Sequence, residues 1–122
     1  MSTKETAQKY KRQTASRYLP VGAQEITSKI MEAECYGVST KHDGHFYLLC
    51  YDGKKAVLIN HGGNTITDLP LLKEASAQLK GKCKDAVLAG ELYLHKEGGR
   101  TRSFDMTAAL DDKSADIYFA AF

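Results

Sequence analysis

The sequence predicts an α+β fold with a mainly antiparallel sheet and flanking helices packed outside it. Two observations predict this class. Apolar residues recur at helical spacing up to residue 34, whereas dense apolar runs separated by glycine-containing turns begin after Gly37. Because runs that flank a short turn pair as hairpins, the sheet is expected to be antiparallel.

Composition limits the class of protein. The chain has 122 residues, of which 43% are hydrophobic and 26% charged, so one domain with a real core is expected rather than a disordered chain. The formal net charge of +2 is too small to indicate a nucleic-acid partner by itself. Basic residues outnumber acidic ones near the N-terminus, which suits a solvated helix face better than a phosphate-binding surface.

The three cysteines, Cys35, Cys50 and Cys83, are odd in number and show no CxxC spacing, which argues against a disulfide framework or a zinc site. Cys50 lies within an apolar run and is interpreted as a small core residue. The N-terminus has no apolar signal-peptide core, and no apolar stretch reaches membrane-spanning length. A reducing, cytoplasmic setting without a membrane is therefore expected.

Two helices are expected before the sheet. The first covers Thr3 to Tyr18, with apolar residues at weakly amphipathic helical spacing. The stretch from Leu19 to Gly22 breaks it, because proline and glycine interrupt helices. The second helix covers Gln24 to Glu34 and carries Ile26 and Ile30 on one face.

The sheet is expected from four apolar runs. Phe46 to Tyr51 and Ala56 to Ile59 flank an Asp-Gly turn, which is a strong hairpin signal. The segment His61-Gly62-Gly63-Asn64 is a second turn. Ala86 to Leu94 and Ile117 to Phe122 are the remaining strands.

Two further helices are expected between these strands. Asp68 is expected to cap the first of them, and Gly81 to end it. Four apolar residues line one face of this helix: Leu71, Leu72, Ala75 and Leu79. A shorter helix is expected from Met106 to Leu110.

The chain ends inside its last predicted strand, and an apolar strand usually pairs with another segment. Residues 1–36 are therefore interpreted as a helical lead-in, and residues 37–122 as the first half of a domain that is truncated at its C-terminal end. A natural C-terminal strand is the alternative interpretation.

Charged residues surround one glycine just before the first predicted strand, in Lys41-His42-Asp43-Gly44. Desolvated charges are costly, so either this is an exposed turn with a weak ion pair or the lysine has a chemical function. A nucleophilic lysine needs an unprotonated amine, and a glycine lets the backbone approach a ligand closely. Glu91 raises a similar question within the apolar strand, where it either points to solvent or belongs to a site.

Four segments occur in an order that resembles a known family. Lys41-His42-Asp43-Gly44 matches the KxDG motif of the covalent nucleotidyltransferases, which include ATP-dependent DNA ligases, RNA ligases and mRNA capping enzymes. LINHGGNTITDLPLL resembles their RxG stretch and the helix start after it, and LAGELYL resembles their DGE motif. IYFAAF resembles the strand that carries an aromatic residue in the nucleotide pocket. Together these segments resemble the first half of a DNA ligase adenylation domain, a partial ATP-grasp-like nucleotidyltransferase fold, and TDLPLL favours the ligase branch.

The resemblance implies a mechanism and partners. Lys41 would attack the α-phosphate of ATP and form lysyl-AMP, with Mg²⁺ as the metal cofactor. The AMP would pass to a DNA 5′-phosphate, and a 3′-hydroxyl would then displace it and seal the nick. The implied partners are ATP and nicked double-stranded DNA, and the chain is expected to be a monomer.

The resemblance also implies roles for five further residues. Asp43 and Gly44 would shape the turn that presents the lysine and line the nucleotide site. Glu91 would contact the ribose or a metal-bound water, and is the candidate metal ligand. Phe122 would stack on adenine, and His61, in place of the arginine of RxG, is the candidate DNA contact.

Several positions depart from the family pattern. Ser39 replaces a glutamate, Ala89 replaces the aspartate of DGE, and Phe46 and His61 replace arginines. The two lost arginines remove bidentate phosphate ligands, so a degenerate domain that binds nucleotide or nucleic acid without chemistry stays open as an alternative. An RNA ligase or a capping-type transferase is a further alternative. The later motifs of the family are absent, so this chain alone is expected to be incomplete for ligation.

Overall fold

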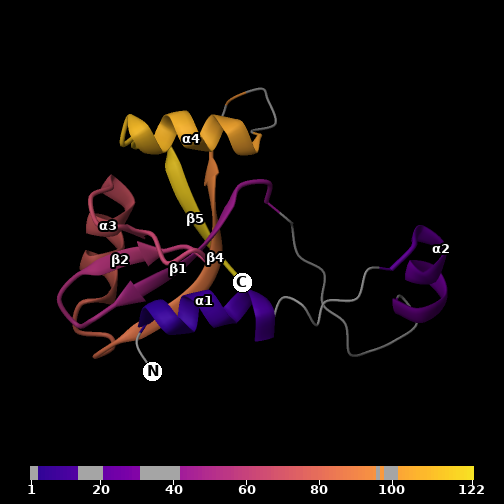
Figure 1. The fold of residues 1–122 in the computed structure, drawn as a ribbon, viewed down its shortest axis with the longest axis horizontal. Coiled ribbons are helices and arrows are strands. Elements are labelled where there is room, and N and C mark those ends of the chain that lie inside the picture. Colours follow the sequence, from indigo (N-terminus) through magenta and orange to yellow (C-terminus); the bar gives the residue numbers. More distant parts are fainter. Residues whose placement is uncertain (1–2, 14–20, 31–41, 96, 98–101) are drawn as a thin grey trace.

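The computed structural model describes residues 3–13, 21–30, 42–95, 97 and 102–122. The helices and strands follow in this order: α1 (Thr3–Gln13), α2 (Ala23–Glu25), η2 (Ile26–Ile30), β1 (His45–Tyr51), β2 (Ala56–Ile59), β3 (Thr65–Ile66), α3 (Pro70–Leu79), β4 (Ala86–Leu94), α4 (Ser103–Asp111) and β5 (Ile117–Ala121). The strands form one antiparallel sheet in the order β3-β2-β1-β4-β5 (Figure 1). The predicted α+β class with an antiparallel sheet and flanking helices is therefore confirmed.

The predicted hairpin between β1 and β2 is confirmed. Tyr51 pairs with Ala56, and the four residues between them close the turn. The side chain of Asp52 stabilises this turn, because its Oδ1 accepts hydrogen bonds from the amides of Lys54 and Lys55, each at 2.9 Å. A carboxylate that accepts backbone amides in this way is typical of a tight turn.

The second predicted turn also joins two strands, β2 and β3. Asn60 organises it, since its Oδ1 accepts a hydrogen bond from the amide of Asn64 at 2.9 Å. The turn carries His61 on an exposed position beside the end of β2. β2 pairs with β1 only from Leu48 to Tyr51, so the first residues of β1 have no strand neighbour on that side.

Helix α3 begins one residue later than the capping prediction requires. Asp68 was expected as the N-cap, but Leu69 occupies that position with φ −136° and ψ 148°, so the prediction is wrong. The physical reason is Pro70, which suits the first helical position and holds the residue before it in an extended conformation. Asp68 instead forms an ion pair with Lys113, which follows α4.

The C-terminal part of the chain follows the prediction closely. β4 has the predicted bounds, and α3 ends at Leu79, just before Gly81. α4 contains the predicted residues 106–110 but begins earlier, because the carboxylate of Asp105 accepts a hydrogen bond from the amide of Arg102 and closes the first turn. β5 ends at Ala121, and the amide of Phe122 still bonds to the carbonyl of Ala89 at 3.0 Å.

The N-terminal helices agree with the prediction only in part. α1 starts at Thr3 as predicted and is described to Gln13, and the rest of the predicted helix lies outside the described residues. The second predicted helix is a short α-helix followed by a π-helical turn, and its remaining residues also lie outside that part of the chain. Ile26 is 43% exposed, so the apolar face expected here is not buried at this residue. Figure 1 shows α1 against the sheet and α2 apart from it.

The sheet separates two apolar clusters of different size. The larger one lies under α3 and α4, and we call this side of the sheet the helical face. Its buried members are Tyr47, Leu49, Tyr51, Ala56, Leu58, Leu69, Leu72, Leu92, Met106, Ala109 and Ile117. The smaller cluster lies on the other side and buries Leu48, Cys50 and Ile59, with α1 packed beside it through Tyr10.

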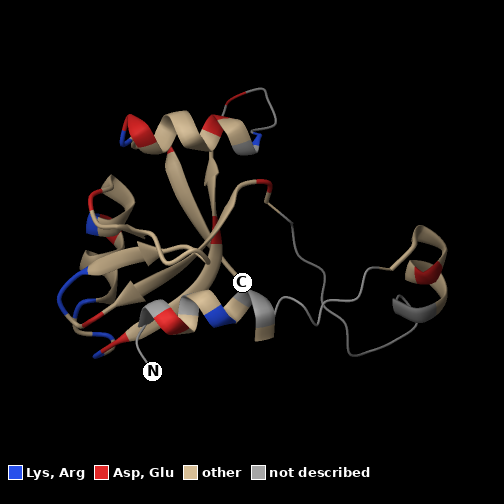
Figure 2. Cartoon of the chain, in the orientation of Figure 1, with Lys and Arg blue, Asp and Glu red and all other residues tan. Residues whose placement is uncertain are grey.

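Charge and burial follow this layered arrangement. Figure 2 shows Lys, Arg, Asp and Glu mainly on turns and helices, whereas the strands are largely uncharged. Cys50 is buried, as predicted, and burial raises the pKa of its thiol to about 11. No helix in the described ranges combines the length and the apolar character that a bilayer span requires.

Candidate functional site

The described part of the predicted lysine motif begins at His42, so Lys41 lies outside the described residues and its role stays a prediction. Asp43 is exposed. Gly44 follows directly and leads into β1. The position of Gly44 therefore fixes where the motif meets the sheet.

A hydrogen bond joins the lysine motif to the strand that carries Glu91. The amide of Gly44 donates to Oε1 of Glu91 at 2.9 Å, across 47 residues of sequence. Glu91 is half-buried and its carboxylate is engaged, so it is not simply a strand residue that points to solvent. The bond connects two of the segments that resemble nucleotidyltransferase motifs.

The backbone of β4 explains why residue 44 is a glycine. A Cβ on Gly44 would lie 1.8 Å from the carbonyl oxygen of Leu92, far inside van der Waals contact. Glycine here allows two strands to approach each other, whereas the sequence interpretation assigned it to the approach of a ligand. Any larger side chain would have to push the start of β1 away from β4.

The register of the sheet brings three residues of interest to one face. Phe46 lies opposite Glu91, and Glu91 lies opposite Ala120. Directly opposite residues in antiparallel strands share a face, and so do residues two apart along one strand. The rings of Phe46 and Phe122 confirm this, with centroids 6.3 Å apart. We call this side of the sheet, opposite the helical face, the motif face.

Aromatic rings surround this part of the motif face. Tyr10 of α1 stacks on Phe46 with centroids 5.2 Å apart and an interplanar angle of 13°. His42 stacks on Tyr93 with centroids 4.2 Å apart, and Tyr93 lies two residues beyond Glu91 on the same strand. Phe122 is 65% exposed, so a face of its ring is available to a ligand.

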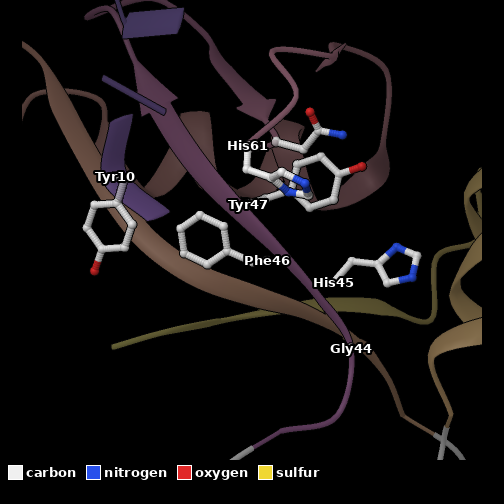
Figure 3. A pocket seen from close by; sticks show the side chains of 7 residues that line it. Tyr10, Gly44, His45, Phe46, Tyr47 and His61 are labelled. Atoms are coloured by element: carbon white, nitrogen blue, oxygen red, sulfur yellow. The ribbon is translucent and has the colours of Figure 1, made fainter. Parts of the chain in front are cut away.

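A cavity of about 440 Å³ opens beside Gly44 (Figure 3). The residues that line it are Tyr10, Gly44, His45, Phe46, Tyr47, Asn60 and His61. It exists because β1 lacks a neighbouring strand before Leu48, which leaves room between the strand and the following turn. Figure 3 shows Tyr10 and Phe46 on one side of β1, and His45, Tyr47 and His61 on the other. His61, the candidate DNA contact, therefore lies at a cavity that also contains the glycine of the lysine motif.

Tyr47 contributes a neutral hydroxyl to this cavity. Burial raises its pKa, and a hydrogen bond with the side chain of Asn60 offsets the rise in part. The phenol therefore stays protonated near neutral pH and can act as a donor. Tyr10, Tyr47 and Asn60 were not predicted as site residues, because their proximity depends on how α1 and the second turn pack against β1.

Gly44 contacts Glu91, and Phe46 lies near Phe122, so parts of three segments that resemble family motifs lie together. No family model, curated protein or solved structure matches this chain. The case for a function therefore depends on the contacts between Gly44, Glu91 and the rings of the motif face.

The described residues offer limited ligands for a metal. No group of three or more His, Cys, Asp or Glu side chains in the described ranges could hold an ion. Mg²⁺ is often bound by only one or two carboxylates together with substrate phosphates, and a single Glu91 carboxylate fits that mode. Oε1 of Glu91 is occupied by the Gly44 amide, and no described residue donates to its other oxygen.

Proposed function

We propose that this chain is part of an ATP-dependent DNA ligase, in which a lysine carries AMP. The observation that supports this most is the hydrogen bond between the Gly44 amide and the Glu91 carboxylate. A register shift of one residue would move Glu91 to the helical face and away from Phe46. The meeting of two separate motifs on one face is therefore a specific property of this fold.

The proposed reaction begins at Lys41. Its neutral amine attacks the α-phosphorus of ATP, a P–N bond forms, the bond to the β-phosphate oxygen breaks, and pyrophosphate leaves. An oxygen of a DNA 5′-phosphate then attacks the same phosphorus and releases the lysine. A 3′-hydroxyl finally attacks the DNA phosphate, which joins the strands and releases AMP. Bound Mg²⁺ would supply neutralisation of the phosphate charge.

The residues of the motif face have separate tasks in this proposal. The Gly44–Glu91 bond fastens the segment between the lysine and β1 to strand β4. This contact would fix where the lysine lies relative to the motif face. The second oxygen of Glu91 would accept a ribose hydroxyl or a water on the metal. Phe122 would stack on adenine through its exposed ring. His61 would contact nicked DNA from the edge of the cavity.

A second candidate is a domain that binds a nucleotide without forming a covalent adduct. Phe46 favours it, because the family has an arginine at this position and the ring here is stacked on Tyr10. An aromatic pair adds apolar surface but supplies no charge for a phosphate. RNA ligases and capping enzymes share the lysine chemistry and differ in nucleotide and substrate.

The test of the proposal is the intact mass of the protein after incubation with ATP and Mg²⁺. The wild type and Lys54→Ala should each gain one adenylyl group, because Lys54 lies on the exposed turn after β1. Lys41→Ala should gain none, and peptide mapping should find the adduct on Lys41. Equal labelling of all three proteins would refute the role of Lys41. ATP binding without any adduct would support the non-covalent domain instead.

Two comparisons separate the members of the lysine-nucleotide class. Labelling by ATP but not GTP supports a ligase over a capping enzyme. Transfer of AMP from the labelled protein to a nicked DNA duplex, but not to nicked RNA, supports the DNA ligase. The reverse preference would assign the chain to the RNA ligases.

A further inference from the structure

The end of the sheet far from Gly44 carries a concentration of lysines. Two come from the turn between β1 and β2, and three come from the segment between α3 and β4. We call these five residues the basic end: Lys54, Lys55, Lys80, Lys82 and Lys84. Figure 2 shows the corresponding blue segments at the turn end of the β1–β2 hairpin and close to it.

The fold, rather than the sequence alone, brings the two segments together. Tyr51 at the end of β1 pairs with Ala86 at the start of β4, so their adjoining loops leave the sheet at the same end. The contact is close, because a Cβ on Gly53 would lie 2.6 Å from the carbonyl oxygen of Lys84. The last turns of α3 join this end through Ser76, whose hydroxyl accepts a hydrogen bond from the amide of Ala56 at 2.8 Å.

The charge of the basic end is weakly compensated. All five lysines are exposed, and none of them takes part in an ion pair with another described residue. Two aspartates, Asp52 and Asp85, lie in the same segments, and five lysines with two aspartates leave a net charge of +3. The whole chain has a formal charge of +2, so the remainder is slightly negative. Residues 4–17 are also cationic, with five Lys and Arg against Glu5, so the basic end is one of two positive segments of the chain and is the one that the pairing of β1 with β4 assembles.

A local role explains only part of this pattern. Cations near the end of a helix interact favourably with its dipole, which accounts for Lys80 directly after α3. Lys54 and Lys55 belong to a different turn, so capping of α3 does not explain why the sequence has them there. Several like charges held close together repel one another, so their proximity points to an anionic partner.

We propose that the basic end binds the phosphate backbone of duplex DNA. The choice of DNA over another polyanion rests on the proposed function. β1 has seven residues, which places the basic end roughly 23 Å from Gly44 at about 3.3 Å per residue. DNA rises about 3.4 Å per base pair, so this distance equals about seven base pairs. A duplex that runs along β1 from the proposed site would therefore meet the basic end about seven base pairs away.

The test measures binding of a fluorescently labelled, intact DNA duplex without ATP, over about 50–200 mM salt. The test variant replaces Lys54, Lys82 and Lys84 with glutamine. Its matched control replaces three exposed cations outside the basic end with glutamine: Lys73, Arg102 and Lys113. Both variants lose the same charge, and their circular dichroism and melting temperatures show whether they keep the fold.

The expected result is a difference between these two variants. The test variant should bind about tenfold or more weakly than wild type, and the slope of log affinity against log salt should fall by about 3. The control should keep the wild-type slope within about 1. Equal slopes in both variants, or no binding of wild type to the duplex, would overturn the proposal. So would binding to phosphatidylserine vesicles in place of DNA.

The outcome is independent of the lysyl-AMP chemistry. The duplex is intact and nucleotide is absent, so failure of adduct formation at Lys41 leaves this measurement unchanged. Conversely, the test variant should still gain one adenylyl group if the proposed function is correct, since the basic end lies at the other end of the sheet. Loss of DNA binding with normal labelling supports the basic end, and normal DNA binding in the test variant refutes it.

Discussion

The two faces of the sheet differ in how completely they are covered. The helical face is covered in large part by α3 and α4 and buries a large apolar cluster, while Leu88 stays 38% exposed beside a cavity of about 420 Å³ on this face. Among the described residues, the motif face buries Leu48, Cys50 and Ile59, and it leaves Phe122 and Val87 more than half exposed. It also carries the half-buried Glu91. The difference indicates that the helical face supplies most of the buried core, whereas the motif face carries the candidate site.

The same contrast appears in the polar contacts. On the motif face, the carboxylate of Glu91 keeps one oxygen without a described donor, although it lies beside aromatic rings. This oxygen is not among the described buried atoms that lack a hydrogen-bond partner, so it costs the fold little and has acceptor capacity that the donor or cation of a ligand can use. Substitutions on the two faces should reveal this difference, with the largest effects expected in the buried core.

Truncation of a large side chain should affect the two faces very differently. Leu58→Ala removes a fully buried side chain from the helical face and should lower the free energy of unfolding by about 2–5 kcal/mol. Phe122→Ala on the motif face should lower it by less than about 1 kcal/mol, because this ring is 65% exposed. Chemical denaturation of both variants measures the difference. Similar losses would show that the motif face carries as much of the stability as the helical face.

Among substitutions that add a single methyl group to the motif face, Gly44→Ala should lower the free energy of unfolding most. Its Cβ would collide with the Leu92 carbonyl, so the start of β1 must move, at a cost of about 1–3 kcal/mol. The hydrogen bond to Glu91 should weaken at the same time, which faster hydrogen exchange of the residue 44 amide would report. Gly62→Ala is the control, because the nearest atom to its added Cβ is a side-chain oxygen at 3.3 Å. Equal stability of the two variants would contradict the close approach of β1 and β4.

These contacts show what the sequence could and could not predict. The bounds of β4 and the two turns follow from local patterns, because an apolar run and an Asp-Gly turn carry their own signals. The N-cap of α3 could also have been predicted from the sequence. Proline favours the first helical position, so Pro70 identifies Leu69 rather than Asp68 as the N-cap. The lack of space for a Cβ at Gly44 could not be predicted, because it depends on the register between β1 and β4. The stacking of Tyr10 on Phe46 could not be predicted either, since it depends on where α1 packs against the sheet.

Two buried tyrosines on the helical face should respond oppositely to loss of their hydroxyl. The hydroxyl of Tyr51 is buried without a hydrogen-bond partner among the described residues, so Tyr51→Phe should be neutral or stabilise by up to about 1 kcal/mol. Tyr47→Phe should destabilise by about 0.5–1.5 kcal/mol, because it removes the hydrogen bond with Asn60. Thermal melts compare the pair. A destabilised Tyr51→Phe would reveal a partner for that hydroxyl.

The smallest expected effect is a pH dependence of the helical face. The hydrogen bond and the charge of Lys113 lower the pKa of Asp68 below its ordinary value of 3.8. Since the folded pKa is lowered, this contribution to stability is present above the unfolded pKa and is lost as pH falls through the folded value. Melting temperatures of wild type and Asp68→Asn should therefore converge at pH values below the folded pKa and separate slightly near neutrality. A constant difference across that range would exclude the ion pair as the cause.

The most direct test of the account asks which face of the sheet meets the nucleotide. Lys41→Ala, which cannot form the adduct, would be titrated with ATP and Mg²⁺ while the backbone amides are followed by NMR. The account predicts chemical-shift changes at Gly44, Phe46, Glu91 and Phe122, with the amides of α3 and α4 unchanged. Changes confined to the helical face, or no change on the motif face at saturating ATP, would contradict it.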